Sequence, residues 1–153
     1  MLILQCRNIK KDFGVHQVLK SIAFDLEEGE RVGLVGKNGA GKTTLINIIA
    51  GRLKPDSGQI IWHREDMQIG YLQQSTYYTS HMLHQLFSGQ GGPEEVSDFL
   101  HITSELGVSK VHQWKDERFS SLSGGERTKL ALAHIWSANP DLLILDEPTN
   151  HLD

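Results

Sequence analysis

Residues 36–44 read GKNGAGKTT, and this stretch decides the fold. It matches the phosphate-loop pattern G-x-x-x-x-G-K-[ST] at Gly36, Gly41, Lys42 and Thr43. Residues 31–35 before the loop predict a short buried strand, and residues 44–50 after it predict the first turns of a helix. Strand, glycine loop and helix in this order form a turn that binds the phosphates of a nucleoside triphosphate.

Each part of the loop has an expected chemical role. We expect the glycines at 36, 39 and 41 to adopt positive φ and turn backbone N–H groups toward an anion, beside the positive end of the helix dipole. Lys42 would bring a positive charge to the β- and γ-phosphates, and the Thr43 hydroxyl is a natural Mg²⁺ ligand. The expected nucleotide-binding residues here are Gly36, Lys37, Asn38, Gly39, Ala40, Gly41, Lys42, Thr43 and Thr44.

A second motif, residues 142–147, ends an apolar run with two carboxylates. The run LLIL predicts a strand buried on both faces of a mainly parallel sheet, and ligands bind beyond the carboxyl ends of such strands. Asp146 is expected to face the Mg²⁺ through a coordinated water, and Glu147 to orient and polarise the attacking water. Either carboxylate alone would be interpreted as a solvated charge, so the phosphate loop is what favours the catalytic interpretation.

The sequence LSGGE at residues 122–126 resembles the signature motif of the ATP-binding cassette (ABC) family. Ser123, Gly124 and Gly125 stand at the start of a predicted helix that continues to about Asn139, and an exposed helix N-terminus attracts an anion. The resemblance implies that this anion is the γ-phosphate bound to an opposite cassette, so that two cassettes enclose two nucleotides. The alternative is an ordinary helix start capped by a serine.

The same resemblance assigns roles to two further residues. Phe13 stands where the family carries an aromatic that stacks on adenine, although aromatics also hold such positions through packing. Gln74 resembles the Q-loop glutamine that reaches the Mg²⁺ or the attacking water, and the adjacent Gln73 leaves the choice between the two open. The resemblance thus implies ATP and Mg²⁺ as cofactors, Glu147, Lys42 and Gln74 as catalytic residues, and Thr43, Gln74 and Asp146 as metal ligands.

Residues 147–153, EPTNHLD, resemble the soluble ABC-F subfamily, which carries two cassettes per polypeptide and acts on the ribosome. Glu126, where transporters more often have glutamine, and the 49 positions between Gln74 and Ser123 agree with this subfamily. The short insert resembles members that protect ribosomes from antibiotics, and housekeeping translation factors are the alternative. Two other interpretations stay open: the ATPase subunit of a membrane transporter, and a truncated ATP-binding module without steady-state hydrolysis.

The predicted fold is α/β, a P-loop NTPase fold of ABC type. It has a mainly parallel sheet core, an N-terminal antiparallel β subdomain and a small helical subdomain. Residues 1–74 are expected to form the β subdomain and phosphate-loop core, residues 75–120 the helical subdomain, and residues 121–153 the signature helix and acidic strand. The resemblance implies that cassettes continue past Asp153, so we expect a truncated cassette whose open sheet edge favours instability or self-association.

Composition predicts an ordinary globular domain that functions in the cytoplasm. The 153 residues are 39% hydrophobic and 22% charged, with no signal peptide and no apolar run long enough to insert into a membrane. The single cysteine, Cys6, in a predicted edge strand, cannot form an internal disulfide and suits a reducing compartment. His81 and His84 could share a helix face, but two ligands make a weak metal site, so surface or packing roles are expected.

The net charge of −4 gives no general electrostatic reason to bind nucleic acid. The cluster Arg7, Lys10 and Lys11 is predicted to be a solvated strand face. The expected partners are therefore a second ABC cassette, in the same full-length chain or in a homodimer, and the ribosome, contacted by other parts of the full-length protein.

Overall fold

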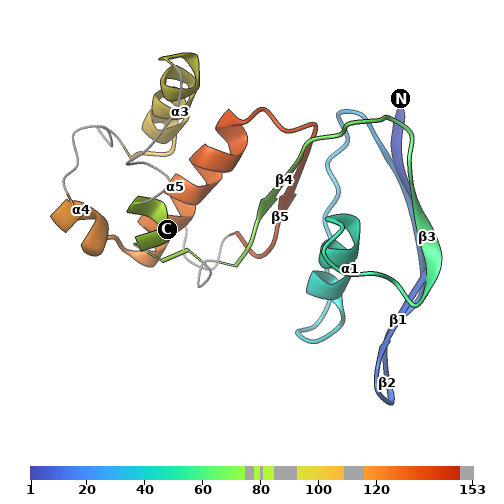
Figure 1. The fold of residues 1–153 in the computed structure, drawn as a ribbon. Helices are drawn as coiled ribbons and strands as arrows, with labels where there is room; N and C mark the ends of the chain where they lie inside the picture. Colours follow the sequence, from blue (N-terminus) through green and yellow to red (C-terminus); the bar gives the residue numbers. More distant parts are fainter. Residues whose placement is uncertain (75–77, 80, 85–92, 109–115, 149–153) are drawn as a thin grey trace. The chain divides into compact units, whose positions relative to one another are not determined.

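The computed structural model describes residues 1–74, 78–79, 81–84, 93–108 and 116–148 (Figure 1). The chain divides into two compact units, Met1–Met67 and Gln68–Asp153, and each is described by itself. The predicted division into three parts at residues 74 and 120 is a finer one, and it stays a prediction. Within the described residues, no helix combines the length and apolar character that crossing a bilayer requires.

The first unit is built on a three-stranded antiparallel sheet. Its strands are β1 (Leu2–Phe13), β2 (His16–Glu27) and β3 (Ser57–Trp62), in the order β2-β1-β3. A tight turn with Gly14 at φ 62° joins β1 to β2. This sheet confirms the predicted N-terminal antiparallel subdomain, and its buried side chains include Ile3, Leu4, Cys6, Ile9, Leu19 and Leu26.

Cys6 does not lie in an edge strand, so that prediction is wrong. β1 pairs with β2 on one side and with β3 on the other, which makes it the central strand of the three. Its four consecutive buried residues, Ile3 to Cys6, are typical of a strand that is covered on both faces. The Cys6 side chain is 1% exposed, and burial, with a smaller contribution from Asp25, raises the pKa of the thiol to about 11. A buried, protonated thiol of this kind is chemically inert.

The segment before the phosphate loop is not a strand. Residues 31–37 have no regular structure, and Val32, Leu34 and Val35 are 57%, 46% and 91% exposed. The prediction of a buried strand over residues 31–35 is therefore wrong, because such a strand needs neighbours that complete its hydrogen bonds and none of the described strands pairs with it. The helix after the loop, α1 (Lys42–Ile49), is present and buries Leu45, Ile46 and Ile48.

The second unit contains a parallel strand pair, as predicted. The prediction that residues 142–145 are buried on both faces is wrong, because Leu145 is 40% exposed and the other three residues are half-buried in a sheet of two described strands. β4 (Ile69–Leu72) and β5 (Leu142–Leu145) run parallel, with Ile69 opposite Leu142 and Leu72 opposite Leu145. α5 (Gly124–Ser137) packs against β4. Gly70 permits this close approach, because a Cβ at that position would stand 2.7 Å from the Ile135 side chain and 3.0 Å from that of Pro140.

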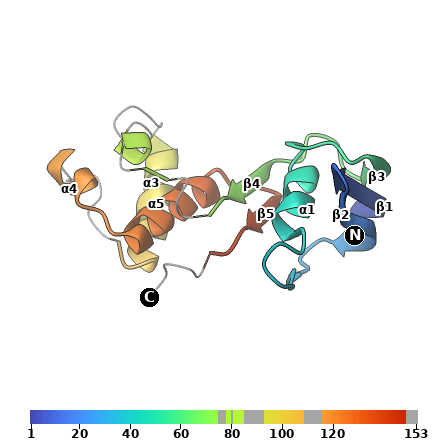
Figure 2. The same ribbon diagram turned by 90° about the horizontal axis from the view of Figure 1, so that it is seen from below.

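The other regular elements among the described residues of the second unit are helices, in agreement with the predicted helical subdomain. α3 (Pro93–Glu105) lies beside α5 (Figures 1 and 2), α4 (Asp116–Ser120) precedes the signature motif, and residues 81–84 are helical. His84 packs edge to face on Phe119, with ring centroids 5.4 Å apart, which agrees with the expected packing role. The core contains Leu72, Tyr78, Leu83, Val108, Phe119, Leu122, Leu130, Ala131 and Leu132.

Candidate functional site

The phosphate loop is an exposed turn held by two left-handed glycines. Gly39 has φ 79° and Gly41 has φ 95°, as expected, and the Ala40 N–H donates to the Lys37 carbonyl at 3.0 Å. Gly36 is not in the left-handed region, so the expectation of positive φ is wrong there. The turn itself spans residues 37–40, and the chain is still without regular structure at position 36.

Lys42 folds back across this turn. Its ammonium donates to the Gly36 carbonyl at 2.5 Å and lies 3.5 Å from the Lys37 carbonyl. A lysine ammonium has three N–H donors, so contacts with loop carbonyls leave it able to bind a phosphate oxygen as well. The charge is thus held at the mouth of the loop, at the start of α1, where the helix dipole also favours an anion.

Gly41 is the phosphate-loop glycine whose replacement we expect to be most disruptive to stability. It is the N-cap of α1, with φ 95°, and a Cβ there would stand 2.7 Å from Val18 Cγ1 and 2.9 Å from Leu19 Cδ2. Gly41→Ala should therefore lower the free energy of unfolding by roughly 2 to 4 kcal/mol, through left-handed strain and overpacking. Urea denaturation monitored by circular dichroism measures this loss.

Gly36→Ala is the matched control for that substitution. A Cβ at Gly36 would meet the Ala40 Cβ at 3.4 Å, an ordinary contact, in backbone that is not left-handed. Its expected effect on the free energy of unfolding is within about 1 kcal/mol. Equal losses for the two variants would show that Gly41 is not specially required.

The acidic pair follows β5 directly. Asp146 is 3% exposed, accepts a hydrogen bond from the Tyr71 hydroxyl at 3.4 Å, and donates its own N–H to the Leu72 carbonyl at 3.0 Å. A buried carboxylate needs such partners. Glu147 is half-buried and has φ 50°, a left-handed conformation uncommon for a residue other than glycine.

The structure places Gln73 and Gln74 at the same end of the strand pair as these carboxylates. Leu72 is opposite Leu145 in parallel register, so Gln73 and Gln74 leave β4 where Asp146 and Glu147 leave β5. Gln73 is half-buried and its N–H donates to the Tyr78 hydroxyl at 2.9 Å, whereas Gln74 is exposed. The exposed side chain favours Gln74 as the ligand-binding residue, and this assignment stays a prediction.

The signature motif starts α5 with a reciprocal cap. The Ser123 hydroxyl accepts the Glu126 N–H at 3.1 Å, and the Glu126 carboxylate accepts the Ser123 N–H at 2.9 Å. Arg118 of α4 also donates to Glu126. The Ser123 N–H, and then Arg118, hold the pKa of Glu126 below its ordinary value, so this carboxylate stays ionised at neutral pH. The serine cap, given above as the alternative to an anion-binding helix start, is thus present.

This capped helix start still presents donors to an anion. Glu126 N–H bonds to the Ser123 hydroxyl, and Arg127 N–H bonds to the Ser123 carbonyl at 3.0 Å. The amides of Gly124 and Gly125 take part in none of the hydrogen bonds found among the described residues. The first amides of a helix have no partner inside it, so a capped start and an anion-binding start coexist at this position.

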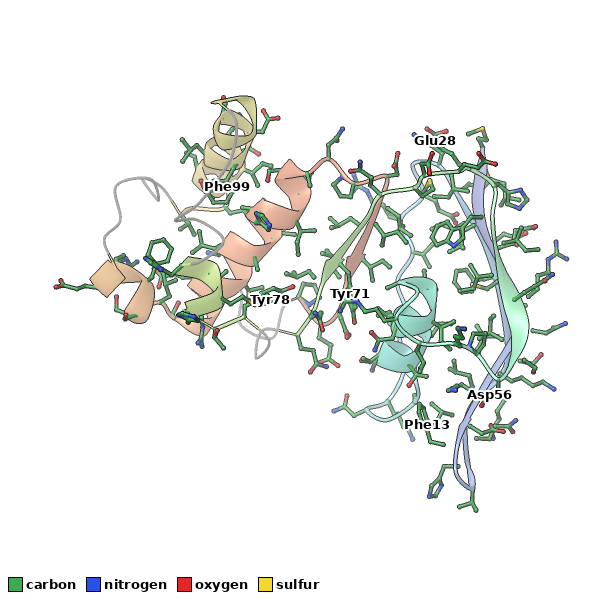
Figure 3. All side chains as sticks on the ribbon, in the orientation of Figure 1. Phe13, Glu28, Asp56, Tyr71, Tyr78 and Phe99 are labelled. Atoms are coloured by element: carbon green, nitrogen blue, oxygen red, sulfur yellow. The ribbon has the colours of Figure 1, made fainter. Side chains whose placement is uncertain are left out.

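Phe13 ends β1 as an exposed aromatic (Figure 3). Its side chain is 50% exposed, which excludes a core position but agrees with the alternative of a strand-end aromatic. The Lys11 ammonium lies 5.6 Å from the ring centroid. An exposed ring offers a face on which a base can stack. Stacking of adenine on Phe13 therefore stays a prediction.

The donor chemistry fits ATP with Mg²⁺. Mg²⁺ is usually held by one or two protein oxygens together with substrate phosphates and water. The Thr43 hydroxyl and the Asp146 carboxylate are oxygen donors of this kind, and within the described ranges no three His, Cys, Asp or Glu residues group into a metal site. A metal held without phosphates would need such a group.

Tyr71 and Arg118 are site residues that the sequence analysis missed. Tyr71 supports Asp146, and Arg118 supports Glu126. Each hydrogen bond joins residues from different segments of the fold, so no local sequence pattern predicts it. A tyrosine inside the apolar strand next to the acidic one is the signal that could have indicated the first.

Comparison with known proteins gives a consistent result. The family model described as "ABC transporter" matches residues 19–150. Two curated relatives are ABC transporter F family member 2 of Arabidopsis thaliana and a sulfate/thiosulfate import ATP-binding protein, CysA, of Pseudomonas syringae. They are 30% and 33% identical, each over 98% of this chain, which covers 29% and 51% of their lengths. The chain spans about a third of the length of several such relatives.

A solved structure supports the fold. A nucleotide-free ATP-binding cassette from an ABC transporter superposes with a TM-score of 0.74 and 26% identity, over 97% of this chain and 70% of that one. The α/β architecture with an antiparallel β subdomain, predicted from the sequence, is therefore that of a P-loop NTPase cassette.

Proposed function

We propose that this chain, which belongs to the ABC transporter family of ATP-binding cassettes, binds ATP with Mg²⁺ and hydrolyses it to ADP and phosphate. Members of this family are ATPases that use ATP with Mg²⁺. The observation that carries the proposal is the acidic pair. A buried, hydrogen-bonded Asp146 and a half-buried Glu147 follow a parallel strand, beside an exposed glutamine.

We assign the chemistry to positioning and electrostatics, as is usual for phosphoryl transfer. The loop amides and Lys42 would bind the phosphates, and Thr43, Asp146 and Gln74 would hold Mg²⁺, which supplies charge neutralisation when bound. Glu147 would accept a proton from the water that attacks the γ-phosphorus, and ADP would leave. Phe13 would stack on the adenine.

A second cassette would complete the site, because ABC cassettes work in pairs. We assign the Ser123 hydroxyl and the amides of Gly124 and Gly125 to the γ-phosphate held by that partner. This assignment is supported by the start of α5, where the first two amides donate no hydrogen bond to another described residue. The partner would lie in the same full-length chain or in a homodimer.

For the biological role, we propose an ABC-F type cassette that acts on the ribosome, in the cytoplasm, as a translation factor or in antibiotic protection. The support is the sequence EPTNHLD at residues 147–153, the glutamate at position 126, and similarity to an F family member. Residues 149–153 of that motif lie outside the described residues.

A transporter ATPase is the second candidate, favoured by the similarity to a sulfate/thiosulfate import ATP-binding protein. Such a subunit would dock a membrane permease. A second cassette in the same full-length polypeptide would favour the ABC-F role, and a permease encoded beside the gene would favour transport.

Sedimentation of the full-length protein with ribosomes tests the proposed role. With a non-hydrolysable ATP analogue, we expect the protein to pellet with ribosomes through a sucrose cushion, and with ADP to stay in the supernatant. Pelleting with membranes but not with ribosomes would overturn the ABC-F proposal. ATPase rates measured against protein concentration test hydrolysis separately, since ATP affinity without steady-state turnover would support a binding-only module.

A further inference from the structure

The three-stranded sheet carries a hollow of about 680 Å³ that the proposed function does not use. All three strands contribute to it, and the phosphate loop does not. Its lining consists of polar and cationic residues and one glycine: Arg7, Asn8, Lys10, Ser21, Ser57, Gly58 and Gln59.

A β-bulge in β1 creates this hollow. Cys6 and Ile9 are both buried, at 1% and 0% exposure, although strict alternation would place them on opposite faces. The pairing with β2 moves from Cys6–Phe24 to Ile9–Ile22, so β1 uses one residue more than β2. The two residues between them, Arg7 and Asn8, are consequently both exposed, and bulges commonly re-aim side chains in this way near functional sites.

Three residues around the bulge have a positive φ, a backbone conformation that few side chains favour. Gly58 of β3 has φ 84°, and a Cβ there would lie 2.3 Å from the Asn8 carbonyl oxygen and 2.5 Å from that of Arg7. Asn8 and Ser21 have φ 50° and 104°, and the Ser21 hydroxyl donates to Asn8 Oδ1 at 3.3 Å. Left-handed residues other than glycine cluster where the surrounding structure serves a function.

The charge of the hollow is uniformly positive. Arg7 and Lys10 are its charged residues, and no acidic residue lines it. Lys20 stands directly opposite Lys10 in the register of β1 and β2, an arrangement of like charges that is destabilising without an anion nearby. Lys11, by contrast, is paired with Asp56 at 2.8 Å, and none of the ion pairs found in the described ranges involves Arg7 or Lys10.

We propose that this hollow binds a phosphate oxyanion. The Arg7 guanidinium offers a planar fork of N–H donors suited to phosphate, and Lys10 offers a point charge. Ser21, Ser57 and Gln59 add neutral donors. No aromatic or aliphatic side chain lines the hollow, so it recognises the phosphate group itself and not a base or an acyl chain. The phosphate is supplied either as a free small anion or by the backbone of an RNA.

Binding assays on the full-length protein test this site, with saturating ADP present to occupy the phosphate loop. The test variant is Arg7→Gln/Lys10→Gln, and the matched control is Arg31→Gln/Lys54→Gln. The control removes one arginine and one lysine that are exposed in the same unit and do not line the hollow. Calorimetry measures pyrophosphate binding, and fluorescence anisotropy measures binding of a labelled oligouridylate across a salt series.

The test variant should lose at least ~10-fold in affinity for one of the two probes relative to the control. A loss confined to pyrophosphate assigns the site to a small phosphate. A loss for oligouridylate, with a salt slope shallower by roughly one per cation removed, assigns it to an RNA backbone. Equal affinities of the test and control variants for both probes would overturn the proposal.

The Arg7→Gln/Lys10→Gln variant is expected to stay folded, so a loss of affinity would not be caused by unfolding. Arg7 and Lys10 are exposed, and removing Lys10 relieves its repulsion with Lys20, so the thermal midpoint should not fall. The single variant Arg7→Gln gives the same comparison with one exposed charge changed, and it should show a smaller loss for the same probe.

Discussion

Glu147→Gln is expected to lower steady-state ATP hydrolysis by the full-length protein by at least ~100-fold while ATP binding persists. The amide has nearly the same shape as the carboxylate, but it cannot accept a proton from the attacking water. Asp146, which lies one residue earlier and is 3% exposed, would still serve the metal. ATP held without turnover should trap two cassettes in a closed, ATP-bound state. Phosphate release, ATP affinity and gel filtration in ATP measure the three effects.

Glu28→Gln is the control for this substitution. It makes the same chemical change on an exposed glutamate that precedes the phosphate loop and has no proposed role in the site. Its hydrolysis rate should match that of the unchanged protein. Full turnover by Glu147→Gln would show that another group activates the water.

Lys42→Ala is expected to weaken ATP binding and to lower hydrolysis by roughly 100-fold or more. The ammonium lies at the mouth of the loop, where it contacts the Gly36 carbonyl at 2.5 Å, and its charge attracts the phosphates. Lys42→Arg should not restore activity, because the planar guanidinium cannot replace a compact point charge within the turn. Titration with a fluorescent ATP analogue and a phosphate-release assay measure both losses.

Lys54→Ala removes a lysine outside the loop and serves as the control, with an expected affinity and rate close to those of the unchanged protein. If Lys42→Ala bound ATP within about twofold of the control, the ammonium would not be a phosphate ligand. The assignment of the loop as the nucleotide site would then rest on its backbone amides alone.

Features with a local pattern in the sequence could be predicted. The helical spacing after Ser123 and the apolar run at 142–145 each produced an element of the expected type, although the strand at 142–145 is less buried than expected. The phosphate loop, the acidic pair and the signature motif are also contiguous in the sequence, so the phosphate loop could be predicted from its spacing and the signature motif from its resemblance to the ABC family. Within the second unit, the structure places Gln74 and Glu147 beyond the carboxyl ends of two paired parallel strands.

Features that depend on distant partners could not be predicted in this way. The central place of Cys6 in the sheet depends on β3, more than fifty positions along the chain. Residues 31–35 have the composition of a buried strand, but composition cannot supply the neighbours that a strand pairs with. The hydrogen bond from Tyr71 to Asp146 likewise joins residues 75 positions apart.

The missing side chain at Gly70 has a mechanical consequence. Because β4 touches Ile135 and Pro140 so closely at this position, α5 and the connection from α5 to β5 cannot slide over the strand pair independently. The helix that begins after Ser123 and the strand pair that carries the carboxylates are therefore held together by this contact within the second unit. A side chain at position 70 would push α5 away from β4, and so a single hydrogen atom at this Cα sets the distance between the signature helix and the acidic strand pair.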